Sequence, residues 1–174
     1  MRPIGAAALV ASGVLLGASL QAQTRPSFAG TWAFQADGDT SPGFLCGTGC
    51  TIAQDAGALV VTRHEQATDI IVILALDGSE TSIPTTLGGQ SFVAKAKARW
   101  IGSRLSLVTV SDVAGRTYTI TTELYLDEHG GLIIERVVLG VPGQSTAPMK
   151  TRYRRLPAIS PSATVPVTPM PSGR

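Results

Sequence analysis

Hydrophobic and polar positions alternate along most of the chain, which is the period of a β-strand with one buried face and one solvent-facing face. The clearest case is the segment 91–100, in which lysine and arginine occupy one face. The opposite face carries Ala94, Ala96, Ala98 and Trp100. In a helix the same basic residues would be scattered around the cylinder. The segment is therefore predicted to be a strand with its alanine face inward.

The same period recurs in further segments that are separated by turn-forming residues. Predicted strands cover residues 28–35, 58–64, 68–76, 80–83, 91–100, 104–110, 117–126, 132–139 and 149–156. The segment 36–50 is rich in Gly, Pro and Asp and is expected to be a loop. Pro84 is expected to end the short strand before it, because proline has no amide hydrogen for a ladder. Turns such as Asp77-Gly78 and Gly130-Gly131 predict sequential hairpins.

Eight or nine strands in sequential hairpins make an up-and-down meander. A sheet of this kind has two edges with unpaired backbone groups, and closure into a barrel removes them. We therefore predict an all-β, antiparallel barrel, with a curled, incompletely closed sheet or a sandwich as the alternative. The interior of a barrel of about eight strands is filled by side chains or holds one small ligand.

The two ends of the chain lack this alternation. Residues 1–22 combine Arg2 with an uncharged stretch rich in Ala, Val and Leu, which is typical of a bacterial export signal cleaved after Ala22. A retained N-terminal anchor is the alternative, although the stretch is short for a membrane span. Residues 157–174 contain repeated prolines and predict a disordered tail, or else a tether or a binding peptide. The remaining residues, 23–156, are predicted to form one barrel domain.

Cys46 and Cys50 are separated by three residues, two of which are glycines. In an oxidising compartment this spacing predicts a local disulfide that pins the loop, because the glycines let the chain turn back tightly. Free thiols, a redox pair or a zinc site with His64 and His129 are the alternatives. Exchange motifs have two intervening residues, and the histidines lack the paired spacing of structural zinc sites. We expect no metal.

Charge and motifs narrow the classes of function. The net charge is +2 and falls to about +1 when Arg2 leaves with the signal, and the basic residues near the C-terminal strand have only Tyr153 as an aromatic neighbour. Nucleic-acid binding is therefore not expected. Glu123 and Glu135 are expected to face each other across a hairpin, but on the outer face. No nucleophile elbow, phosphate loop or dinucleotide motif is present, so we predict a protein that is not an enzyme and has no cofactor.

Short motifs in these segments resemble those of a known family. Gly30-Thr31-Trp32 on the first predicted strand resembles the Gly-x-Trp motif of lipocalins and their calycin relatives. The turn Asp77-Gly78-Ser79-Glu80 and the hairpins at 98–105 and 124–132 are similar to those of small exported bacterial lipocalin-like proteins of unassigned function. The resemblance covers most of residues 28–156.

The resemblance implies a barrel whose closed end holds Trp32, with a basic residue of the last strand across the indole ring. Gly30 and Trp32, with Arg152 and Arg154, are the expected closing residues, and Arg155 is the other candidate cation. No helix is predicted after the last strand, although full lipocalins usually have one.

The inward face of the barrel supplies the candidate ligand-binding residues. These lumen candidates are Ala94, Ala96, Ala98, Trp100, Tyr118, Ile120 and Leu124. The three alanines either leave room for a ligand or let the strand pack against the opposite wall. In the first case Trp100 fluorescence is expected to respond to the ligand.

These predictions lead to two alternative hypotheses for the function of the protein. The first is an exported monomer, periplasmic or secreted and without a membrane span after signal removal, that binds a small hydrophobic ligand. The alternative is a protein-interaction or envelope-assembly module with a filled barrel, for example a hydrolase inhibitor, whose partner is another exported protein.

Overall fold

The computed structural model describes residues 25–37, 41–65, 68–87, 90–113, 115–141 and 145–157, and the regular elements in those residues are all β-strands. The strands are β1 (Gly30–Gln35), β2 (Gly49–Gln54), β3 (Ala58–His64), β4 (Asp69–Ala75), β5 (Glu80–Leu87), β6 (Gln90–Ile101), β7 (Arg104–Val113), β8 (Arg116–Leu126), β9 (Leu132–Leu139) and β10 (Met149–Arg155). The predicted signal peptide and residues 158–174 of the predicted tail lie outside the described residues. No helix able to cross a bilayer occurs in the described part of the chain.

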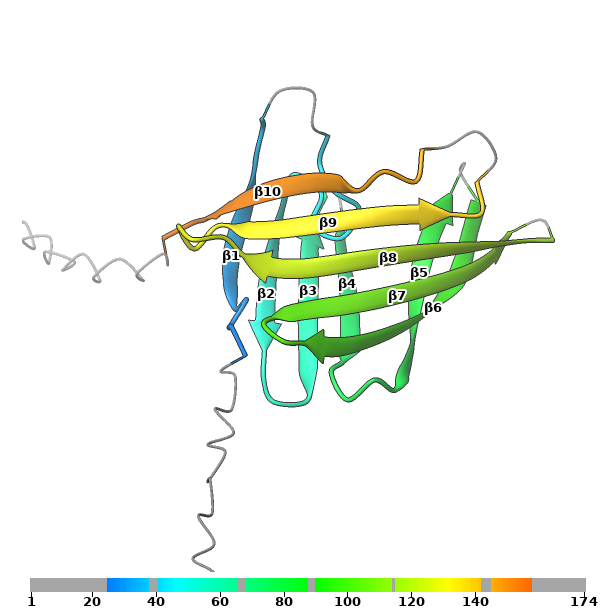
Figure 1. The fold of residues 1–174 in the computed structure, drawn as a ribbon, viewed down its shortest axis with the longest axis horizontal. Coiled ribbons are helices and arrows are strands. Elements are labelled where there is room, and N and C mark those ends of the chain that lie inside the picture. The colour runs from blue at the N-terminus through cyan, green and yellow to red at the C-terminus, as the bar shows by residue number, and fades with distance from the viewer. Residues whose placement is uncertain are drawn as a thin grey trace, which may run out of the picture.

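The strands form one antiparallel sheet in the order β4-β3-β2-β1-β10-β9-β8-β7-β6-β5. The first strand pairs with the last, with Trp32 opposite Arg155. Figure 1 shows the sheet curled on itself, so that β7 to β10 cross in front of β1 to β4. The predicted antiparallel meander is confirmed, and the barrel that it forms is nearly closed. It has ten strands instead of eight or nine.

The additional strand is β2, which the sequence pattern does not predict. Its Ile52 lies opposite Gly30 of β1 and Val61 of β3, so β2 is paired on both sides. Cys50 and Ile52 are buried and alternate with the more exposed Thr51 and Ala53. This alternation covers too few positions beside a glycine-rich loop to indicate a strand by itself.

The prediction that the strand beginning at Glu80 ends before Pro84 is wrong. β5 continues through Pro84 to Leu87. Pro84 lies opposite Val93 of β6. β5 is an end strand of the sheet and pairs only with β6. No strand pairs with its free side, where a proline without an amide hydrogen interrupts no ladder. The rule that keeps proline out of strands applies to central strands, and the sequence alone does not reveal which strand lies at the end.

The barrel is left open between β4 and β5. These strands follow each other through the Asp77-Gly78 turn, in which Gly78 has a φ of +86°. They occupy opposite ends of the sheet order and share no ladder. The Ala75 amide instead donates a hydrogen bond of 3.4 Å to the Thr81 hydroxyl. Buried side chains of both strands, Leu74 and Ile83 among them, belong to one hydrophobic core, so packing replaces backbone pairing at this seam.

The inner face of the sheet carries that core. On β6 the predicted alternation is confirmed, since Ala94, Ala96 and Ala98 are at most 1% exposed while the side chain of Lys95 is 68% exposed. The largest fully buried side chains include Trp32, Tyr153, Phe28, Leu59, Leu105 and Leu124. Full burial of a leucine-sized side chain stabilises a fold by about 1.5–3 kcal/mol.

Trp32 is buried where β1 meets β2 and β10, and its indole nitrogen donates a 2.8 Å hydrogen bond to the Phe28 carbonyl. Gly30 has a φ of +143°, a conformation that residues with a side chain rarely adopt, which explains the glycine of this motif. The guanidinium carbon of Arg155 lies 4.7 Å from the centroid of the Trp32 ring. A cation therefore covers the indole, as the resemblance implies.

Of the three arginines that the sequence offered for this position, the structure places Arg155 over the indole, and not Arg152 or Arg154, the two expected closing residues. Thr151 and Tyr153 are buried, so the odd-numbered positions of β10 face inward. Arg155 shares their face, whereas Arg152 and Arg154 lie on the opposite face, Arg152 at 3.6 Å from the Asp127 carboxylate. Side chains that alternate across a strand cannot place Arg152 or Arg154 over a ring on the inner face.

Candidate functional site

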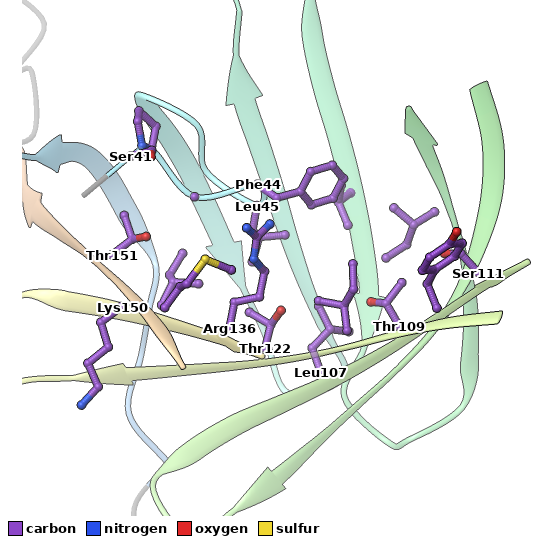
Figure 2. A pocket seen from close by; sticks show the side chains of 18 of the residues that line it. Ser41, Phe44, Leu45, Leu107, Thr109, Ser111, Thr122, Arg136, Lys150 and Thr151 are labelled. Carbon is purple, nitrogen blue, oxygen red and sulfur yellow. The ribbon is translucent and has the colours of Figure 1, made fainter. Parts of the chain in front are cut away.

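A cavity of about 370 Å³ lies inside the barrel. Its walls come from β4 to β10 and from the segment at residues 41–45. Figure 2 shows side chains from these elements converging on one space, with Leu107 and Thr109 on the wall formed by β7. The side chains of the described residues therefore leave a space inside the barrel.

The cavity wall is mostly apolar. Val72, Ile83, Leu107, Ile120 and Ile134 contribute hydrocarbon side chains from five different strands. The hydroxyl-bearing residues of the wall are Ser41, Thr109, Ser111, Tyr118, Thr122 and Thr151. A concave, largely apolar surface with a few polar groups is the usual form of a small-molecule site.

The segment that forms one side of the cavity is fixed by the predicted disulfide. Cys46 and Cys50 are bonded to each other and are fully buried, which confirms their pairing. Phe44 and Leu45 precede the first cysteine directly and line the cavity. The disulfide therefore holds part of the cavity wall against β2, which contains Cys50.

Tyr153 of β10 ties the same segment to the barrel. Its hydroxyl accepts a 3.0 Å hydrogen bond from the Gly43 amide and donates one of 3.1 Å to the Gly47 carbonyl. A Cβ atom on Gly43 would lie 3.1 Å from this hydroxyl, so the close approach favours glycine. Burial raises the pKa of Tyr153, an effect that the Gly43 hydrogen bond and the positive charges of Arg136 and Arg63 partly oppose.

Arg63 of β3 holds the segment from its other side. It donates a hydrogen bond to the Phe44 carbonyl and its guanidinium carbon lies 5.3 Å from the centroid of the Phe44 ring. It also forms an ion pair of 2.8 Å with Glu65. The charge of Arg63 is thus compensated within the protein.

Arg136 of β9 is the cationic residue that points into the cavity (Figure 2). It lies between Thr122 of β8 and Met149 of β10 in the strand register, and both of these also line the cavity. Lys150 touches the rim as well, but its ammonium group is 3.5 Å from the Glu135 carboxylate on the outer face. No acidic residue is among the described residues of the wall.

The predicted lumen residues divide into two groups. Tyr118 and Ile120 line the cavity. Ala94, Ala96, Ala98 and Leu124 are buried on the inner face but lie outside the cavity wall. Trp100 also lies outside it, since its ring stacks on Phe28 at 5.6 Å between centroids and has the Arg25 guanidinium at 5.8 Å. The three alanines of β6 thus belong to the packed core. Trp100 is not placed to touch a ligand in this cavity.

Sequence reasoning missed Arg136 and the segment at residues 41–45. In β9 the run Leu-Ile-Ile-Glu-Arg-Val-Val-Leu has apolar residues on both faces, so its period does not reveal that Arg136 points inward. The loop position of residues 41–45 gave no indication that Phe44 and Leu45 fold back into the barrel. The available signal was the cysteine spacing, because a disulfide between Cys46 and Cys50 restrains the position of the loop that precedes β2.

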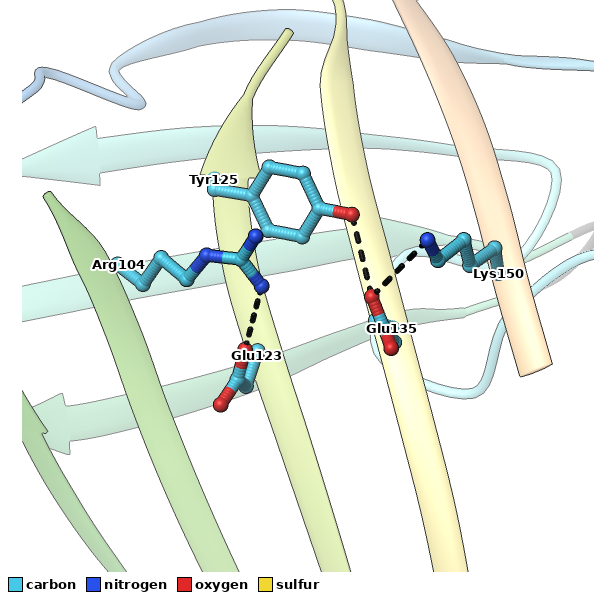
Figure 3. A network of polar contacts seen from close by, with 5 residues as sticks. All are labelled: Arg104, Glu123, Tyr125, Glu135 and Lys150. Atoms are coloured by element: carbon cyan, nitrogen blue, oxygen red, sulfur yellow. Dashed lines mark hydrogen bonds and ion pairs between the residues drawn. The ribbon is translucent and has the colours of Figure 1, made fainter. Parts of the chain in front are cut away.

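Glu123 and Glu135 lie opposite each other on β8 and β9, as predicted. Figure 3 shows how this pair is compensated: Arg104 is 2.8 Å from Glu123, while Tyr125 donates a 3.1 Å hydrogen bond to Glu135 and Lys150 lies 3.5 Å from it. The hydrogen bond with Glu123 is the main cause of the raised pKa of Arg104. These groups connect four neighbouring strands, β7 to β10, on the outer face, and neither carboxylate lines the cavity.

The histidines are also on the surface. His64 lies 3.0 Å from the Asp69 carboxylate and 3.0 Å from the Thr51 hydroxyl, and His129 lies 3.4 Å from Glu128. No cluster of three or more His, Cys, Asp or Glu side chains suited to a metal ion occurs among the described residues.

Comparison with known proteins adds no family to this geometry. No protein-family model and no curated protein matches the sequence of this chain.

Proposed function

We propose that this chain is an exported, lipocalin-like barrel protein that binds one small hydrophobic ligand in its interior. The observation that carries the proposal is the apolar cavity of about 370 Å³ inside the barrel. A filled barrel serving only as an interaction module would not need such a space. The cavity therefore favours ligand binding over that alternative.

Two further observations support export and the lipocalin-like assignment. The buried disulfide is consistent with an oxidising compartment, and the predicted signal at residues 1–22 agrees with a periplasmic or secreted location. The first and last strands pair, and Arg155 covers Trp32 beside that pairing. These are the features that the Gly30-Thr31-Trp32 motif led us to expect.

The apolar wall sets the expected strength of binding. Burial of each methylene group contributes about 0.8 kcal/mol, so a chain of about ten methylenes gains at most about 8 kcal/mol. That free energy corresponds to a dissociation constant of about 1 μM before the costs of ordering the ligand are subtracted. Because these costs weaken binding, we expect dissociation constants of about 1 μM or higher.

Thermal unfolding of the purified protein with fatty acids, retinoids and haem tests the proposal, because a ligand that binds only the folded state raises the melting temperature. Thr109→Phe places a ring in the cavity and should abolish the shift. Val110→Phe is the matched control, since Val110 neighbours Thr109 on β7 but is exposed and absent from the cavity wall. Circular dichroism establishes that both variants fold. A panel without any shift for the unmodified protein, or an unchanged shift in Thr109→Phe, would contradict the proposal.

A further inference from the structure

We infer that the ligand carries a single carboxylate at the end of its apolar part, and that Arg136 binds this carboxylate. The inference rests on the proposed function, because it assigns the chemical class of the ligand for the same cavity. Four observations on the inner face of the barrel support it.

The first observation is the lack of a counter-charge. Arg136 forms no hydrogen bond or ion pair with any described residue, and no described residue of the cavity wall is acidic. The other cations near the cavity are compensated, since Arg63 pairs with Glu65 and Lys150 with Glu135. The cavity therefore contains one uncompensated positive charge.

The second observation is the degree of burial. Arg136 is half-buried, so water in the cavity can solvate its guanidinium when no ligand is bound. An apolar ligand that filled the cavity would displace that water and leave the guanidinium desolvated and unpaired. Burying an unpaired charge costs several kcal/mol, which would cancel much of the hydrophobic gain. A ligand that also supplies an anion avoids this cost.

The third observation concerns the position of the charge. Arg136 stands between Thr122 and Met149 in the register, with Leu107 beyond Thr122 on β7. Arg136 thus has a hydroxyl-bearing residue opposite it on β8, and apolar residues follow along the cavity wall. An amphipathic molecule could place its head at Arg136 and Thr122 while its chain contacts the rest of the wall.

The fourth observation is the match between the two groups. A guanidinium donates two parallel hydrogen bonds to a carboxylate, which fixes the orientation of the head. One arginine neutralises the single charge of a carboxylate, whereas a phosphate monoester carries about −1.5 to −2 at neutral pH. A monocarboxylate is therefore the head group that Arg136 balances.

Isothermal titration with three probes of equal chain length tests the inference: dodecanoate, dodecanol and dodecyltrimethylammonium. We expect the unmodified protein to bind dodecanoate about tenfold or more tightly than dodecanol, which corresponds to about 1.4 kcal/mol, and the ammonium compound most weakly. Arg136→Met keeps an unbranched apolar stem but removes the guanidinium and its charge, and should abolish the preference for the acid. Arg136→Lys should retain part of it, because the charge remains without the planar fork.

Arg99→Met is the matched control, because Arg99 is an exposed arginine on the outer face of β6 and should leave the preference unchanged. Circular dichroism and the melting temperature establish that each variant folds. A tenfold preference for dodecanoate that survives in Arg136→Met, or equal binding of the acid and the alcohol by the unmodified protein, would overturn the inference while leaving ligand binding intact. Binding of none of the three probes would instead contradict the proposed function itself.

Discussion

Tyr153 links the last strand to the segment that precedes β2, through the hydrogen bonds of its hydroxyl to Gly43 and Gly47. Tyr153→Phe leaves that amide and that carbonyl without their partner, so we expect a loss of about 1–3 kcal/mol in the free energy of unfolding. Urea denaturation at neutral pH measures this loss. An unchanged midpoint would mean that the segment is held by its other contacts alone.

Tyr153 should also make the free energy of unfolding depend on pH. Burial raises the pKa of Tyr153 in the folded state, so the folded protein keeps the phenol proton to a higher pH than the unfolded chain. The free energy of unfolding should therefore fall as pH rises above about 10, the ordinary value for tyrosine. Urea titrations between about pH 8 and 11 should show a smaller fall in Tyr153→Phe. Parallel curves for the two proteins would contradict the raised pKa.

At the scale of elements, the segment between β1 and β2 depends on the Cys46–Cys50 bond. The closed loop is short, so the chain-entropy relation predicts that the disulfide stabilises the fold by only about 2 kcal/mol. We expect Cys46→Ala/Cys50→Ala to lose about this amount and a further contribution from lost packing, since both residues are fully buried. Urea denaturation measures both. The reduced form of the unmodified protein separates them, because it lacks the bond but keeps the sulfur atoms.

At the scale of the whole molecule, the seam between β4 and β5 should be the least protected part of the sheet. β8 is paired on both sides, whereas β4 and β5 are each paired on one side. Backbone amides of β4 and β5 that face the seam should exchange their hydrogens faster than those of β8, because they lack a ladder partner. Hydrogen exchange followed by mass spectrometry or NMR measures this difference. Equal protection of β4, β5 and β8 would indicate a fully paired barrel.

The sequence by itself determined the features that depend on neighbouring residues. The alternation at residues 91–100, the turn at Asp77-Gly78 and the pairing of Cys46 with Cys50 all follow from local spacing, and the structure contains each of them. Arg155 was among the three candidate cations that the sequence offered for Trp32, and the alternation along β10 places it on the same face as Tyr153.

Only the tertiary structure decided the features that depend on residues far apart in the chain. The place of β5 at the end of the sheet, which admits Pro84, follows from the pairing of all ten strands. The cavity and the uncompensated charge of Arg136 depend on which side chains from seven strands and one loop meet inside the barrel. The alternation of hydrophobic and polar residues along a strand shows which side chains share a face. The curvature and stagger of the curled sheet decide which of those side chains touch and which leave a space.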